Sequence, residues 1–112
     1  MERFKNTLQR GSVRFIVFEE GGIWYAAGLE FNIVETGSTP QEALLLLFEA
    51  LAGYVESAKK IKARPHVLNQ KPDPEYEKMW LDRQMKKPST KNVFSSGELS
   101  IRQALRGLAV PA

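Results

Sequence analysis

The sequence predicts an α+β fold: a three-stranded antiparallel meander, one long amphipathic helix, and a C-terminal helical extension with room for a short fourth strand. Residues 13–36 contain three short runs rich in β-branched and aromatic side chains, separated by turns that contain glycine, a pattern typical of strands. Residues 39–61 combine a helix-start signal with apolar residues at helical spacing. Strands that precede helices in this way are typical of α+β proteins rather than of alternating α/β folds.

The three predicted strands span residues 13–18, 23–27 and 31–36. Both faces of the first strand are largely apolar, so we expect both faces of the sheet to be covered. Gly21-Gly22 supplies the positive φ angles of a tight hairpin between the first two strands. Because the connections are short, the strands are expected to form an antiparallel meander.

Thr39, Pro40 and Glu42 predict the start of the long helix. Thr39 fits the N-cap, Pro40 fits the first helical position, and Glu42 stands where the acidic member of a capping box belongs. Lysines in the last turns suit the negative end of the helix dipole, and Pro65 stops the helix, so it should end at about Ile61.

One stripe of this helix is apolar and is expected to pack on the sheet. Its members are Leu44, Leu47, Phe48, Leu51, Tyr54, Val55 and Ala58. Leu45 and Leu46 lie outside the stripe. They are expected either to make flanking contacts or to belong to an interface with a subunit or partner.

Residues 1–64 therefore form the predicted core, and residues 65–112 form an extension packed on it. Asp73-Pro74 predicts a helix near 74–86, and a weaker helix is expected near 99–108, after a loop at 96–97. Residues 66–68 and 92–95 are both candidates for the fourth strand.

The helix near 74–86 carries aromatic residues on one side, and two interpretations of that side are open. Tyr76, Met79 and Trp80 are expected to cover the second apolar face of the sheet, which carries Ile16 and Phe18. In the alternative, the aromatic side chains and the nearby basic residues form a nucleic-acid surface.

The composition of the 112 residues is that of one globular domain, with 43% apolar and 26% charged residues. The chain has no cysteine, which excludes disulfides and thiolate metal sites. Residues 1–8 contain no apolar run of the secretory type, and the longest apolar stretch, 43–48, is far shorter than the roughly 20 residues of a membrane span. We therefore expect a soluble cytoplasmic protein.

The net charge of +3 is distributed unevenly. Residues 1–58 hold four basic and eight acidic side chains, a net of −4, whereas residues 59–112 hold twelve basic and five acidic side chains, a net of +7. An acidic first half and a basic second half indicate two surfaces suited to different partners, or simply a solvated surface.

Several of these segments together resemble the HicB-like antitoxin family over roughly residues 13–60. The resemblance rests on the acidic-glycine hairpin FEEGG at 18–22, the aromatic-alanine strand IWYAA at 23–27, and the Gly-x-Thr-x-x-Glu-Ala helix start at 37–43. It departs from the family at 28–32, where the Pro-rich, Gly-Cys-like loop is missing, and at 65–112, where no DNA-binding module is recognisable.

The resemblance implies a truncated RNase H-like fold and binding to a small HicA-type toxin that cleaves mRNA. It also implies a homodimer or higher homo-oligomer, and it raises the question of operator DNA binding. An active RNase H fold needs carboxylates that converge on Mg²⁺, one of them in the middle of the first strand. Phe15, Ile16 or Val17 occupies that position. The single histidine, His66, has no recognisable partner for a metal site or a catalytic triad. We therefore expect no catalytic residues, metal or cofactor.

Three functions follow as hypotheses. The first is an antitoxin or derived binding module whose acidic half meets a basic toxin, with a partner interface at Glu19, Glu20, Trp24, Leu45 and Leu46. The second is a nucleic-acid-binding regulator that uses Lys86, Lys87, Lys91, Arg102 and Arg106, provided that these residues share one face. The third is an orphan non-catalytic domain.

Overall fold

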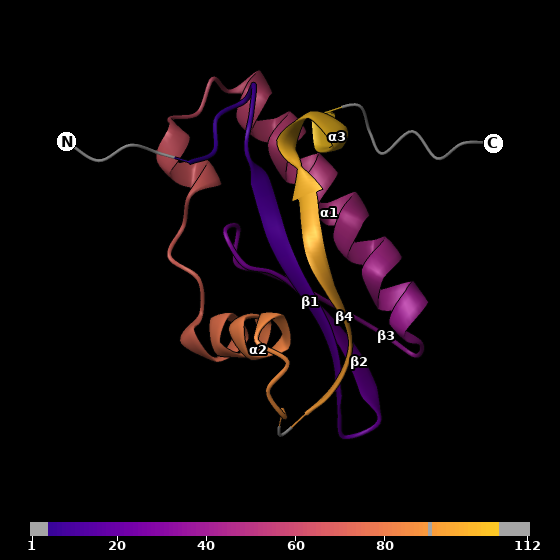
Figure 1. Ribbon diagram of the computed structural model, residues 1–112. Helices are drawn as coiled ribbons and strands as arrows, with labels where there is room; N and C mark the ends of the chain where they lie inside the picture. Colours follow the sequence, from indigo (N-terminus) through magenta and orange to yellow (C-terminus); the bar gives the residue numbers. More distant parts are fainter. Residues whose placement is uncertain (1–4, 90, 106–112) are drawn as a thin grey trace.

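The computed structural model of the protein describes residues 5–89 and 91–105, and it confirms the predicted α+β class. The elements, in chain order, are β1 (Ser12–Glu20), β2 (Ile23–Gly28), β3 (Ile33–Gly37), α1 (Pro40–Lys60), the 3₁₀ helix η1 (Pro65–Leu68), α2 (Pro74–Gln84), β4 (Asn92–Ser100) and α3 (Ile101–Leu105). The strands form one antiparallel sheet in the order β3-β2-β1-β4. Helix α1 lies on one face of this sheet and α2 on the other (Figure 1).

The predicted meander is present as β1, β2 and β3. Gly21 and Gly22 connect the first two strands with φ angles of 61° and 81°, in the left-handed region that glycine enters without steric cost. Glu20 therefore pairs with Ile23 in a tight hairpin.

The fourth strand runs along the free side of β1, and it corrects three expectations. Residues 66–68 belong to η1 rather than to a strand, because Pro65 fixes a helical φ at its start. The expected loop at 96–97 lies inside β4, since Gly97 pairs with Phe15. The last helix begins at Ile101, not at residue 99; residues 106–108 of that prediction lie outside the described part.

The α1 face of the sheet holds the larger core. Helix α1 begins as predicted, with Thr39 Oγ1 accepting a hydrogen bond from the Glu42 backbone N–H at 3.1 Å. Its buried residues, Ala43, Leu47, Leu51, Val55 and Ala58, pack with strand residues such as Val13, Val17 and Ala26. The helix contacts mainly β2 and β3. Most of β4 therefore has no helix above it on this face, whereas at its end Leu99 is buried with Ile101 and Ala104 of α3.

The α2 face holds a second core, as the sequence predicts. Met79 is buried there with Ile16, Phe18, Ala27 and Leu29, and Tyr76 and Trp80 pack beside them. The rings of Phe18 and Tyr25 are stacked with centroids 5.4 Å apart. The short helix α2 lies across β1 on this face (Figure 1), with Tyr76 against Phe18 and Glu77 paired with Arg14.

A buried asparagine, which the sequence analysis did not single out, ties the first described residues to η1. Asn6 is 2% exposed. Its Nδ2 donates to the Leu68 carbonyl at 2.8 Å, and its Oδ1 accepts from the Ser12 N–H at 2.8 Å. Asn69 returns a further pair of hydrogen bonds to the Asn6 backbone. We call this pair the Asn6–Asn69 latch.

In the part of the chain that the structure describes, no helix is both long and apolar enough to cross a membrane.

Candidate protein-interaction surface

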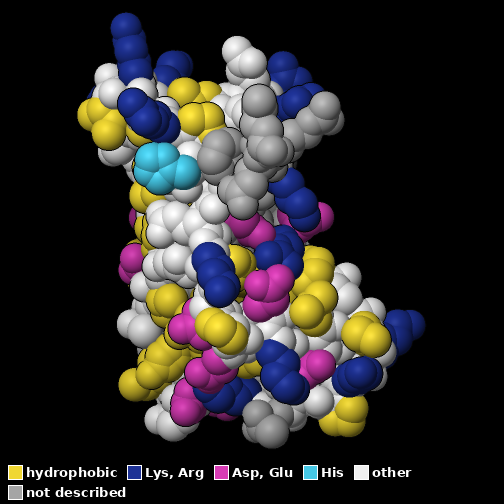
Figure 2. Space-filling model, turned by 90° about the vertical axis from the view of Figure 1, so that its left-hand side faces the viewer, with side chains coloured by type: hydrophobic (Ala, Val, Ile, Leu, Met, Phe, Trp, Pro, Cys, Tyr) yellow, Lys and Arg dark blue, Asp and Glu magenta, His cyan; other side chains and the backbone are white. Residues whose placement is uncertain are grey.

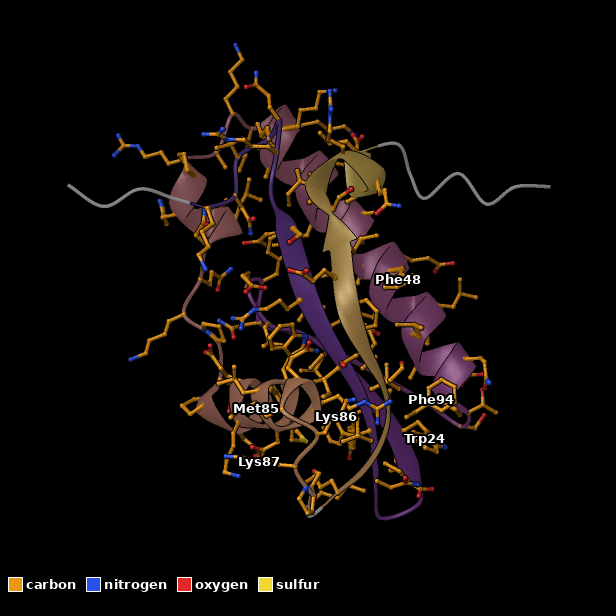
Figure 3. All side chains as sticks on the ribbon, viewed as in Figure 1. Trp24, Phe48, Met85, Lys86, Lys87 and Phe94 are labelled. Atoms are coloured by element: carbon orange, nitrogen blue, oxygen red, sulfur yellow. The ribbon has the colours of Figure 1, made fainter. Side chains whose placement is uncertain are left out.

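An incompletely buried group of aromatic rings lies on the α1 face, beside the helix. Trp24 and Phe94 meet edge to face with ring centroids 6.0 Å apart, and Phe15 meets Phe48 in the same way at 5.2 Å. Phe94 is 43% exposed. We call these four residues the aromatic surface. Figure 3 shows Trp24, Phe48 and Phe94 on the same side of the sheet as α1.

The aromatic surface results from the strand register. Trp24 stands opposite Glu19 and two residues before the buried Ala26, so it points to the α1 face. Phe94 is the extra residue at an irregularity where β4 shifts its pairing between Val17 and Phe18, and such a bulge redirects a side chain. Because α1 lies over β2 and β3, these rings keep solvent-exposed edges.

The predicted partner interface is only partly brought together. Glu19 lies beside Trp24 on the α1 face, where its carboxylate accepts from Asn92 Nδ2 at 3.3 Å. Leu45 is 55% exposed and precedes Phe48 by three residues, which places the two side chains on neighbouring positions of α1.

Two members of the predicted interface point elsewhere. Leu46 follows Leu45 by a rotation of about 100° around α1, away from Phe48. Glu20 lies on the α2 face, where its carboxylate is 2.9 Å from Lys91 Nζ. Phe48 and Phe94 lie outside the interface predicted from the sequence; the signal for Phe94 is an aromatic residue within a short candidate strand at the edge of the sheet.

Lys91 is held by the protein rather than offered to a ligand. Its ammonium group pairs with Glu75 of α2 and with Glu20, and it lies 5.2 Å from the centroid of the Phe18 ring. Hydrogen bonds to Glu75 and then to Glu20 raise the pKa of Lys91 to about 12. The residue therefore fastens the start of β4 to α2 and to the hairpin.

The basic residues proposed for nucleic-acid contact do not form one surface among those described. Lys86 and Lys87 follow the end of α2, whereas Arg102 is in α3 at the opposite end of the molecule (Figures 1 and 3). Arg106 lies outside the described residues. Figure 2 shows the α2 side of the molecule, where Lys and Arg are interspersed with Asp and Glu.

Arg14 anchors a second ionic group, between β1 and α2. Its Nε is 2.6 Å from a Glu30 oxygen, its Nη1 is 3.3 Å from Glu77, and its guanidinium carbon lies 5.0 Å from the centre of the Trp80 ring. Burial lowers the pKa of Arg14, but Glu30 and Glu77 outweigh this effect and raise it overall. An open hollow beside this group is lined by Lys5, Asn6, Gly11, Ser12, Arg14, Glu30, Asn69, Gln70, Pro72 and Glu98.

The centre of β1 carries no carboxylate. The residues there are Phe15, which contacts Phe48, and the buried Ile16 and Val17. Among the described residues, no group of three or more His, Cys, Asp or Glu side chains is arranged to hold a metal ion.

The fold and this surface define a class: a small α+β protein with a partly exposed aromatic surface beside α1 on its sheet. Comparison of the chain with protein-family models, with curated proteins and with solved structures gives no match in any of the three.

Proposed function

We propose that this protein is a HicB-like antitoxin or a binding module derived from one, which neutralises a small basic mRNA-cleaving toxin of the HicA type by direct contact. In this proposal it acts in the cytoplasm as a homodimer, without catalytic activity, metal or cofactor. The observation that carries the proposal is the aromatic surface, because exposed aromatic side chains at the centre of a patch are typical of protein-binding sites.

The charges around the aromatic surface support a basic partner. Glu19 borders Trp24 on the sheet. Glu49 follows the exposed Leu45 by four residues on α1, so it lies beside Leu45 on the helix that borders the aromatic surface. An apolar centre with an acidic rim fits a basic toxin that presents apolar side chains among its lysines and arginines.

A capture experiment tests this proposal. The tagged protein is used at low salt to capture partners from a lysate of its native cells. The captured proteins are identified by mass spectrometry, and ribonuclease activity is measured before and after release. A stoichiometric small basic protein that is inhibited while bound and cleaves RNA when released supports the proposal. Capture of nucleic acid without such a protein contradicts it and favours the regulator hypothesis.

Phe94→Ala links the captured partner to the aromatic surface. The variant should fold normally, because Phe94 is 43% exposed, and it should weaken binding by about 1 kcal/mol or more, as expected for truncation of a central aromatic contact. Met85→Ala is the matched control, since Met85 is 62% exposed and lies at the end of α2, away from the aromatic surface (Figure 3). Equal binding by both variants would exclude the aromatic surface as the toxin site.

A further inference from the structure

Strand β4 forms an edge of the sheet, and its register shows which of its backbone groups point outward. The Arg14 carbonyl accepts from the Leu29 N–H, so the peptide groups of Arg14 face β2. Backbone groups alternate in direction along a strand. Those of Phe15 therefore face β4, where Phe15 pairs with Gly97. Gly97 and every second residue of regular β4 bond to β1, and the residues between them face outward.

Ser96 and Glu98 are the outward-facing residues in the middle of β4. Within the described residues, no side chain or loop bonds to the backbone groups of either one. Both ends of the edge are occupied: Arg83 donates to two carbonyl groups at the start of β4, and Gln103 Oε1 accepts from the Ser100 N–H. The unpaired stretch is therefore short and has defined limits.

This stretch has few of the devices that protect an edge strand. Between residues 92 and 100 there is no lysine and no proline, and Glu98 is the only charged side chain. Exposed edges of this kind pair readily with another strand. The irregularity at Phe94 bends only the beginning of β4. The edge lies at the front of the molecule in Figure 1, with α1 and α2 to either side.

We propose that β4 pairs antiparallel with β4 of a second copy of this chain, with the two Gly97 residues at the two-fold axis. In this register Ser96 of each copy stands opposite Glu98 of the other, and the two outward-facing residues exchange four N–H···O=C bonds. Each Glu98 carboxylate, which already accepts from Ser12 Oγ at 3.0 Å, is then opposite a serine hydroxyl rather than another carboxylate.

Neighbouring symmetric registers fit less well. With Glu98 at the axis, the two carboxylates would be directly opposite, and Ser96 would meet Ser100, whose N–H is already bonded to Gln103. With Ser96 at the axis, Glu98 would meet Phe94, whose carbonyl is already bonded to Arg83. The Gly97 register alone among the three uses only free backbone groups.

The lack of a side chain at Gly97 also favours its position at the two-fold axis of the proposed dimer. The Phe15 ring lies over Gly97, with Phe15 Cζ only 2.9 Å from the place of a Cβ atom. Two such rings, each in contact with its own Phe48, would face each other across the axis on the α1 side of a continuous eight-stranded sheet. This pairing supplies an interface for the homodimer of the proposed function, but it does not depend on the toxin, because it needs no partner other than a second copy of the chain.

The oligomeric state of the purified protein, measured by sedimentation equilibrium, tests the pairing. We expect a dimer. Ser96→Glu should raise its dissociation constant by roughly 2- to 30-fold, since it places two pairs of like charges opposite each other. Ser96→Lys, the matched variant, should leave the constant unchanged or lower it, because lysine then stands opposite Glu98. Ser96→Pro should weaken the dimer further by removing two intermolecular donors, without removing a bond to β1.

Circular dichroism of each variant checks that it folds, and the Glu–Lys comparison remains decisive if the proline variant does not. A wild-type protein that stays monomeric up to about 1 mM, the range of very weak association, would overturn the proposal. So would a dimer that tolerates Ser96→Glu, or one that Ser96→Lys weakens equally.

Discussion

The Asn6–Asn69 latch allows the sharpest test of what holds this fold together. Asn6→Ala removes the acceptor of the Ser12 N–H and the donor to the Leu68 carbonyl, both at 2.8 Å. Leu68 is 2% exposed, so its carbonyl loses a partner in a place that water reaches poorly. A buried polar group left unpaired costs about 1–3 kcal/mol. The Ser12 N–H is partly accessible and should cost less.

We therefore expect Asn6→Ala to lower the free energy of unfolding by about 2–4 kcal/mol, a large share of the ~5–15 kcal/mol typical of a domain. In urea this corresponds to a transition midpoint lower by about 1–2 M, with an unchanged slope. Asn92→Ala is the control, because it makes the same chemical change at an exposed residue whose side chain donates to a Glu19 carboxylate oxygen at 3.3 Å. If the two variants unfold at the same urea concentration, the latch contributes nothing and the reasoning is wrong.

Two further predictions concern backbone geometry and pH. Gly11→Ala should destabilise the protein strongly in thermal unfolding, because the φ angle of Gly11 is +109° and a Cβ atom there would lie 2.2 Å from Asn6 Oδ1. Gly53 lies in α1 with open space around it, so Gly53→Ala should stabilise the protein by about 0.5–1 kcal/mol. Hydrogen bonds to Glu75 and Glu20 raise the pKa of Lys91 to about 12, and burial raises the pKa of Tyr76, so both groups hold their protons more tightly when folded. The contribution of Lys91 should be fully present below its unfolded pKa near 10 and be lost as pH rises through about 12, and that of Tyr76 should also be lost at alkaline pH. Lys91→Met should reduce this alkaline loss, and an unchanged pH profile would contradict the assignment.

Local signals predict the core of this fold well. The Thr39–Pro40–Glu42 start, the glycine hairpin and the apolar stripe of α1 each depend on neighbours a few residues away, and each is present in the structure. The packing of Tyr76, Met79 and Trp80 on the second sheet face is confirmed for a related reason, because an apolar sheet face needs a cover.

The C-terminal part is less predictable because tertiary contacts decide it. The run SSGE at residues 95–98 has the composition of a loop, yet it is a strand because β1 presents an unpaired edge and the Phe15 ring fills the space above Gly97. Tertiary pairing has overridden local propensity at this place.

The candidate site shows the same division. Trp24, Glu19 and Leu45 lie within the segment where local patterns are strong, and the structure places all three on or beside the α1 face. Phe94 is brought to Trp24 only through the pairing of β4 with β1. The basic residues belong to the positively charged second half of the chain, but Arg102 does not share a face with Lys86 and Lys87, because it follows β4 to the far end of the sheet.

The pairing of β1 with β4 also has a consequence for biosynthesis. Ser12 and Glu98, which are hydrogen-bonded in the folded protein, lie 86 positions apart in the chain. At translation rates of about 5–20 residues per second, β1 leaves the ribosome several seconds before β4 exists to pair with it. During that interval, the edge of β1 that later pairs with β4 is unpaired over the apolar residues 15–18. A nascent chain of this protein is therefore most vulnerable to aggregation or to chaperone capture after α1 has formed and before β4 has emerged.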